Sequence, residues 1–287
     1  MLNSIPVFYS QSMVAEVSSF SPSAGKPEHV LTSWRNLGIA LDVHDVAPAD
    51  NELLSLAHNP DYIKRIFDGQ EINGFKNKRV DLAETCRYTV AVMRYAGLEA
   101  LRNGRVAVAP VAGFHHARYA KSAGFCTFNG LVITAWALKN AGLVQSVGIV
   151  DCDFHYGDGT ASLIELLELD SWLKHYTLGE QPYIVPEKSE ELFLHLPEVL
   201  EGMSGCDLIL YAAGADPHIN DPLGGFLTTE QLLRRDELVF SRCAALGIPV
   251  AWNLAGGYQR DEENGIRPVL DIHDNTMRAC ARTYLSL

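Results

Sequence analysis

Four short runs of almost uniformly apolar residues limit most strongly what this chain can fold into. They are Val106–Pro110, Val147–Val150, Leu208–Ala212 and Pro249–Leu254. Strands covered on both faces, as in parallel sheets, have such continuous apolar runs, whereas half-exposed strands alternate apolar and polar residues. We therefore predict that these four segments are buried parallel strands.

Helical patterns fill the intervals between these runs. Helical spacing with recognisable start or stop residues occurs over Ala83–Asn103 before Gly104, from the candidate N-cap Asn129 to Gly142, and from the T-x-x-Q capping box of Thr228 and Gln231 to Gly247. Alternating strands and helices predict an α/β fold, with a central parallel sheet and helices on both faces.

The length and composition are typical of a globular protein with a large core. The chain has 287 residues, of which 47% are apolar and 20% are charged. We expect residues 1–287 to form a single domain, since α/β domains often reach this size.

Several classes of protein are disfavoured by the sequence. The net charge is −12 and no Lys/Arg-rich run occurs, so no nucleic-acid partner is expected. No apolar run is long enough to cross a bilayer, and the N-terminus lacks the pattern of a secretory signal. The six cysteines are scattered, without a CxxC pair, which is typical of reduced thiols and predicts a cytoplasmic protein. A homo-oligomer is compatible with all of this.

Polar side chains gather directly after each of the four apolar runs. In chain order they are His115 and His116, then Asp151, Asp153, His155 and Asp158, then Asp216, and finally Tyr258. The carboxyl ends of parallel strands lie at one edge of a sheet, which is where ligands of open α/β sheets bind. We expect these side chains to converge there.

One imidazole and two carboxylates in this set could hold a metal ion. Asp153, His155 and Asp216 would leave a coordination position open for water and substrate, which is the pattern of catalytic rather than structural zinc. Such a metal polarises a carbonyl group and activates water. The ligand set therefore predicts a hydrolytic metal site.

The remaining side chains have the chemistry that hydrolysis of an amide needs. His116 or His115 would take a proton from water and deliver one to the leaving amine. Tyr258 can donate a hydrogen bond to the developing oxyanion. Asp151 and Asp158 would fix the tautomer and basicity of the two histidines.

Each motif alone also has an ordinary structural explanation. A His-His pair is usually a surface or core feature, D-x-D-x-H can be an Asx turn or a calcium-like loop, and GADP and GGY can be plain turns. All four strand ends, however, carry complementary chemistry. The joint occurrence therefore favours a site.

The same segments resemble the histone deacetylase superfamily, and specifically its bacterial deacetylase-like and acetylpolyamine amidohydrolase branch. The segments, in family order from His58 to the C-terminus, are GFHHARYAKSAGFCTFNG, DCDFHYGDGT, AGADPHINDPLGGFLTTEQLLRRD and LAGGY. The resemblance implies an arginase/deacetylase-like three-layer fold. It also implies one zinc ion per chain, bound by Asp153, His155 and Asp216.

The resemblance further assigns individual roles. It implies that His116 is the general base and His115 its electrostatic companion, with Asp158 and Asp151 as their respective partners, and that Tyr258 polarises the acyl carbonyl. Substrate-binding residues would be Gly124, Phe125 and Gly256. A structural potassium ion would be bound by Asp151, Asp153, His155, Thr177 and Leu178.

This chain departs from the family pattern after Leu173. Gly179 stands where histidine is common, and Tyr183 is the candidate for the second aromatic residue of the substrate channel. Asp81 could lie on a loop that contacts the substrate or could be a carboxylate at a helix start.

We therefore expect a zinc-dependent or ferrous-iron-dependent amidohydrolase acting on an N-acylated amine, such as acetyl-lysine, an acetylpolyamine or a related metabolite. An arginase-type binuclear manganese enzyme would need a second D-x-D, but Asp216 is followed by Pro217 and His218. A non-catalytic acyl-amine-binding protein of the same fold would have lost catalytic residues, and none is lost here.

Overall fold

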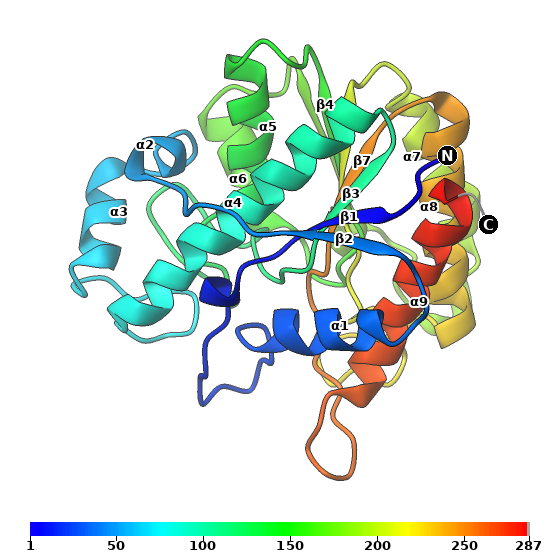
Figure 1. The fold of residues 1–287 in the computed structure, drawn as a ribbon, viewed down its shortest axis with the longest axis horizontal. Helices are drawn as coiled ribbons and strands as arrows, with labels where there is room; N and C mark the ends of the chain where they lie inside the picture. The colour runs from blue at the N-terminus through cyan, green and yellow to red at the C-terminus, as the bar shows by residue number, and fades with distance from the viewer. Residues whose placement is uncertain (286–287) are drawn as a thin grey trace.

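A seven-stranded parallel sheet forms the centre of the molecule in the computed structural model, which describes residues 1–285 (Figure 1). The strand order is β2-β1-β3-β7-β6-β4-β5, and every neighbouring pair is parallel. The strands are β1 (Ile5–Phe8), β2 (Leu41–His44), β3 (Val106–Ala109), β4 (Val147–Asp151), β5 (Leu173–Thr177), β6 (Leu208–Ala212) and β7 (Val250–Asn253).

Helices cover both faces of this sheet and bury two separate cores. In β3, Val106 and Val108 join the core on one face, and Ala107 and Ala109 join the core on the other. The first core packs under α1 (Lys26–Arg35), α7 (Glu191–Gly202), α8 (Thr229–Leu246) and α9 (Arg267–Tyr284). The second packs under α2 (Asn51–Leu54), α3 (Pro60–Phe67), α4 (Val80–Asn103), α5 (Gly130–Asn140) and α6 (Asp158–Leu166). The predicted three-layer architecture is confirmed.

The predicted elements and their caps are present. All four apolar runs are strands, and the second run extends by one residue to include Asp151. The Asn129 side chain accepts a hydrogen bond from Val132 N at 3.1 Å, and the capping box of Thr228 and Gln231 is formed. Gly104 ends α4 in the left-handed region, where glycine costs least.

Three strands were missed by the sequence analysis, two of them because they lack a continuous apolar run. β2 is an edge strand with mostly exposed side chains, and β5, at the other edge, has exposed Lys174 and half-buried His175 between buried residues. β1 contains Pro6, which cannot donate to a ladder. Its pairing with β3 accordingly has one residue pair, whereas its pairing with β2 has four.

Three further observations complete the description of the fold. No helix among residues 1–285 is long and apolar enough to traverse a bilayer. All six cysteines are free thiols. The two ends of the described part of the chain lie close together, since Leu2 N donates to Tyr284 O at 2.8 Å (Figure 1).

Candidate active site

The sheet order brings the four polar clusters together. β3, β7, β6 and β4 are consecutive neighbours in space, although they are far apart in sequence. Their carboxyl ends are followed by the segments that carry the two histidines, the tyrosine and the predicted metal ligands. The expected convergence of these clusters at one edge of the sheet is present.

Asp153, His155 and Asp216 form a compact cluster. One ligand atom of each residue lies within 4.8 Å of the others. His155 Nδ1 is 3.1 Å from Asp153 Oδ1 and 3.0 Å from Asp216 Oδ2. Both carboxylates are buried, whereas the His155 side chain is 31% exposed, so the cluster is open to solvent on the histidine side.

Backbone amides hold the two carboxylates in place. Gly256 N donates to Asp153 Oδ2 at 2.7 Å, and Phe154 N donates to Asp216 Oδ1 at 3.2 Å. The segment after β7 is thereby tied to the ligands that follow β4 and β6. The cluster is preorganised by the same loops that supply it.

The electrostatics of the cluster fit a bound cation. Burial, and then the negative charge of Asp153, raise the pKa of Asp216 to about 8. Burial alone would lower the pKa of His155, but hydrogen bonds to Asp153 and Asp216 raise it to about 11. Without a bound cation, protons on Asp216 and His155 therefore offset the negative charge of the buried carboxylates. A nitrogen and carboxylate oxygens are ligands that suit zinc and similar divalent ions.

His115 and Asp151 form a buried pair beside this cluster. His115 Nδ1 is 2.7 Å from Asp151 Oδ2, and His115 Nε2 is 3.7 Å from Asp153 Oδ1. Burial opposes protonation, but the charges of Asp151 and Asp153 outweigh it and raise the pKa of His115 to about 9. His115 is therefore an imidazolium at neutral pH.

His116 has the opposite protonation behaviour. Its Nδ1 is 2.6 Å from Asp158 Oδ1, and Arg118 donates to the other oxygen of Asp158 at 2.6 Å. Burial, and then the positive charge of His115 with its ring centroid 4.1 Å away, lower the pKa of His116. Nδ1 carries the proton donated to Asp158, which leaves the Nε2 lone pair of His116 free.

Tyr258 completes the cluster from the end of β7. Its ring lies edge-on to His155 with centroids 6.3 Å apart and is 5.9 Å from the Phe125 ring. Its backbone N–H donates to Asp221 Oδ2 at 2.7 Å. Burial, and then the charges of Asp153 and Asp216, raise the pKa of Tyr258 well above its ordinary value, so the hydroxyl is a neutral donor.

Two glycines make close approaches that no other residue could make. A Cβ on Gly124, which has a positive φ of 50°, would lie 2.2 Å from His116 Cδ2. A Cβ on Gly256 would lie 2.3 Å from Asp216 Oδ2. Gly256 thus contacts the predicted ligands directly, and its contact with substrate stays a prediction.

The site loops also store backbone strain. Phe114, Phe125 and Ala255 have φ values of 94°, 63° and 48°, in the left-handed region that disfavours residues with a Cβ. These residues directly precede His115, follow Gly124 and precede Gly256. Strain of this kind concentrates at functional sites, where the surrounding structure imposes it.

Two buried cations at the site were missed by the sequence analysis. Lys26 Nζ donates to Ala255 O at 2.6 Å and to Gly256 O at 3.1 Å, and burial lowers its pKa to about 8. No sequence signal marks Lys26, which lies about 230 positions before its partners.

The second buried cation, Arg235 of α8, contacts the backbone beside two ligands. Its Nη1 donates to Cys152 O at 3.2 Å and to Gly214 O at 2.8 Å. Its Nε donates to Asp236 at 2.9 Å. The R-R-D sequence at residues 234–236 is the signal that could have indicated it.

The prediction for Tyr183 is wrong. Its hydroxyl is hydrogen-bonded to that of Tyr176 at 3.0 Å and its ring stacks on His195, so it belongs to the core under α7. Gly179 is explained by packing, because a Cβ there would lie 2.1 Å from the His155 carbonyl carbon. Asp81 is exposed in the first turn of α4 and pairs with Arg79, as a helix-start carboxylate does.

Three of the five predicted potassium ligands, Asp151, Thr177 and Leu178, lie next to one another. Thr177 is the direct neighbour of Asp151 in the pairing of β5 with β4, and Leu178 follows it. Thr177 Oγ1 accepts a hydrogen bond from Gly157 N at 3.0 Å. A potassium ion at this position stays a prediction.

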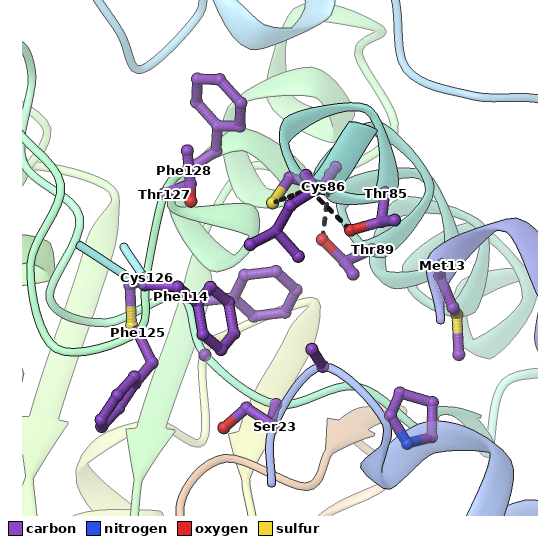
Figure 2. A pocket seen from close by; sticks show the side chains of 16 residues that line it. Met13, Ser23, Thr85, Cys86, Thr89, Phe114, Phe125, Cys126, Thr127 and Phe128 are labelled. Carbon is purple, nitrogen blue, oxygen red and sulfur yellow. Dashed lines mark hydrogen bonds between the residues drawn. The ribbon is translucent and has the colours of Figure 1, made fainter. Parts of the chain in front are cut away.

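A small cavity of about 30 Å³ lies behind the Phe125 segment. Figure 2 shows that Thr85, Cys86 and Thr89 of α4 face it from one side and Phe114 from the other. Its size allows roughly one or two water molecules. None of the predicted metal ligands lines it.

Similarity to known proteins agrees with this geometry. Residues 23–168, just over half of the chain, match the histone deacetylase domain. The chain belongs to the histone deacetylase family. An uncharacterized protein of Picosynechococcus sp. is 30% identical over 259 residues, covering 82% of this chain and 83% of that protein. Polyamine deacetylase HDAC10 of Rattus norvegicus is 27% identical over 233 residues, covering 65% of this chain and 39% of HDAC10.

Solved structures of the histone deacetylase family share the fold. The HD domain of HDA15 has a TM-score of 0.80 at 17% identity, covering 100% of this chain and 92% of that one. Acetylpolyamine aminohydrolase from Burkholderia pseudomallei has a TM-score of 0.73 at 14% identity, covering 97% and 99%. The match to the deacetylase domain itself ends at residue 168, before Asp216 and Tyr258.

Proposed function

We propose that this deacetylase-family protein is a zinc-dependent amidohydrolase that removes an acetyl or other acyl group from an N-acylated amine. The observation that carries the proposal is the meeting of three metal-ligand side chains, two His–Asp pairs and a buried tyrosine at one edge of the sheet. This is the set of groups that metal-assisted hydrolysis of an amide needs.

Asp153, His155 and Asp216 would hold the ion. A zinc or ferrous ion bound there would act as a Lewis acid toward the acyl carbonyl and lower the pKa of water. The cation-free protein carries protons at these side chains instead, and binding would release them.

His116 acts as the general base in this proposal. Its Nε2 lone pair is free because Nδ1 donates to Asp158, and its lowered pKa keeps the ring neutral at neutral pH. It takes the proton of water at Nε2 and later gives it to the departing amine. His115, kept protonated by Asp151, contributes positive charge beside the developing oxyanion.

Tyr258 donates its hydroxyl hydrogen to the acyl oxygen. Its raised pKa keeps that hydrogen in place, and Asp221 fixes the backbone from which the ring projects. Phe125 packs against the Tyr258 ring and would line the path of the substrate chain. Exclusion of water by these rings strengthens the hydrogen bond to the oxyanion.

The substrate class rests on two kinds of support. Two similar proteins have names that refer to acetylated polyamines, which are small molecules. At the site itself, the ring of Phe125, the expected channel aromatic, packs against Tyr258. We therefore propose acetylpolyamines, acetyl-lysine or related small amides as substrates, handled in the cytoplasm, with a structural potassium ion near Asp151 and Thr177.

Measuring the metal content distinguishes a metal-binding enzyme from a protein that shares the family fold without a metal site. Mass-spectrometric metal analysis after loading should give one transition-metal ion per wild-type chain, and Asp216→Ala should lose most of this metal. Asp170 is an exposed carboxylate before β5, and the control variant Asp170→Ala should bind as much metal as wild type. Equal metal in Asp216→Ala and wild type would contradict the ligand assignment. Two metal ions per chain would favour the binuclear alternative. The structure speaks against that alternative, because His218 Nε2 is hydrogen-bonded to Thr229 Oγ1 at 3.0 Å.

Catalysis is tested by a panel of acetylated amines. Tyr258→Phe should keep its metal and lose roughly 10²–10³ in kcat, the usual cost of one oxyanion donor. Tyr88→Phe, on α4, is the matched control and should behave as wild type. Tight binding of these amides without hydrolysis by the metal-loaded wild type would favour the non-catalytic binding protein instead.

A further inference from the structure

The exposed ring of Phe20 lies directly against Tyr258. The two rings stack with centroids 6.1 Å apart and planes inclined by 24°. Phe20 is 57% exposed, whereas Tyr258 is 7% exposed. Phe20 therefore stands at the solvent end of a row of aromatic rings that leads down to the site.

The loop that carries Phe20 is held in place from both ends. Ala15 N donates to Ala24 O at 3.1 Å and closes the loop. Arg79 Nη1 donates to Glu16 O at 2.9 Å, and Arg260, two residues after Tyr258, donates to Phe20 O at 3.5 Å. A loop fixed in this way can present a ring at a defined position, which lowers the entropic cost of binding.

No other aromatic residue of the expected segment takes this position. Tyr183 is the one aromatic residue between Leu178 and Glu190, and it is buried in the core against Tyr176 and His195. Phe125, the first channel aromatic, contacts Tyr258 from its own loop at 5.9 Å. No ring contact joins Phe20 and Phe125 within residues 1–285, so the two rings flank Tyr258 separately.

A surface groove of about 700 Å³ is lined by Phe20, the charged side chains of Arg260 and Asp271, and Tyr258, which is the member of the catalytic cluster that reaches it. A substrate whose acyl oxygen reaches the Tyr258 hydroxyl must extend its amine portion outward, past the more exposed rings. Phe20 then meets the part of the substrate on the amine side of the scissile bond. An exposed phenylalanine ring offers apolar surface to an alkyl chain and no charge or hydrogen bond.

We propose that Phe20 forms the second aromatic wall of the substrate channel and selects amides whose amine carries an unbranched alkyl chain. This inference rests on the proposed function, because it assumes that the amide is bound at the site. It assigns the second wall to the N-terminal loop, not to the segment that follows β5.

A chain-length series tests this assignment. The substrates are N-acetyl derivatives of linear primary amines from propylamine to hexylamine, together with branched isomers. Each methylene moved from water onto the Phe20 ring is worth up to about fourfold in kcat/KM. In wild type, kcat/KM should rise along the linear series, and the branched isomers should be poorer.

Variants of Phe20 test whether the dependence of kcat/KM on chain length comes from this ring. In Phe20→Ala, the rise of kcat/KM with chain length, taken relative to the propyl member for the same protein, should flatten. Phe20→Leu should keep an intermediate slope. Leu143→Ala removes a side chain that is 53% exposed near the opposite end of β4, and it should reproduce the wild-type slope. A Phe20→Ala slope equal to that of wild type would overturn the inference.

Binding measurements keep this outcome distinct from failure of the proposed function. Dissociation constants of the same amides for the purified full-length proteins can be measured by ligand-observed NMR, whether or not hydrolysis occurs. No hydrolysis of any member would refute the proposed activity. The wall would still be supported by tightening with chain length in wild type that Phe20→Ala loses, and it would be refuted if both proteins show the same trend.

Discussion

Arg235→Met is the change that should reveal how the two metal-ligand loops are held together. Arg235 is fully buried on α8 and forms an ion pair with Asp236, its Nη2 lying 2.8 Å from Asp236 Oδ1. It also donates to the carbonyl groups of Cys152 and Gly214, the residues just before Asp153 and two before Asp216. One side chain therefore joins the ends of β4 and β6.

The expected cost follows from burial. Removing one partner of a buried ion pair leaves an uncompensated charge and typically costs about 3–5 kcal/mol. With an unfolding entropy of about 2.1 cal/mol/K per residue, this chain of 287 residues loses about 0.6 kcal/mol per degree at its midpoint. The melting temperature should therefore fall by roughly 5–8 °C. The metal affinity of the folded protein should also fall, by about 10–100-fold, as it does when ligand-supporting groups are removed.

The assay combines thermal unfolding by circular dichroism with chelator competition at a temperature where the variant is folded. Arg242→Met is the matched control, since Arg242 on the same helix forms an exposed pair with Glu201. Exposed pairs contribute about 0–1 kcal/mol. If Arg235→Met loses no more stability than Arg242→Met, or keeps wild-type metal affinity, the reasoning about this junction is refuted.

Three further predictions concern the site itself. Gly124→Ala should displace the His116 ring and lower kcat by about 10–100-fold without loss of metal, and wild-type turnover would contradict this. Asp158→Asn removes a hydrogen bond that raises the pKa of His116, so the acid limb of the kcat/KM profile should move to lower pH; an unmoved limb would exclude His116 as the base. Metal binding must displace protons from His155, with a pKa of about 11, and from Asp216, with a pKa of about 8. Chelator competition should therefore show affinity rising about 100-fold per pH unit below pH 8 and about tenfold above it, and a pH-independent affinity would disprove the proton count.

The central strands were predictable because both of their faces are covered. Continuous apolar runs such as Leu208–Ala212 record that burial directly, and all four runs are strands. The edge strand β2 has no continuous apolar run, since it reads LDVH and is mostly exposed. Its place in the sheet therefore depends on its pairing with β1 and not on its own composition.

The site was predictable to the extent that it follows strand ends. Polar residues after apolar runs indicated where Asp153, His155 and Asp216 would meet, because parallel strands align their carboxyl ends. The contacts of Lys26 and Phe20 join segments more than 200 residues apart, and neither has a local pattern. Such contacts depend on the path of the chain, which periodicity does not encode.

The buried lysine beneath Ala255 has a consequence for the valence of the ion. Apart from Asp236, which pairs with Arg235, four carboxylates are buried around the site: Asp151, Asp153, Asp216 and Asp221. Two cations, Lys26 and protonated His115, face them, which leaves two negative charges in a poorly solvated interior. Two protons, on His155 and Asp216, restore electroneutrality in the cation-free protein at neutral pH. An ion of charge +2 held by Asp153, His155 and Asp216 would supply the same two positive charges that these protons supply.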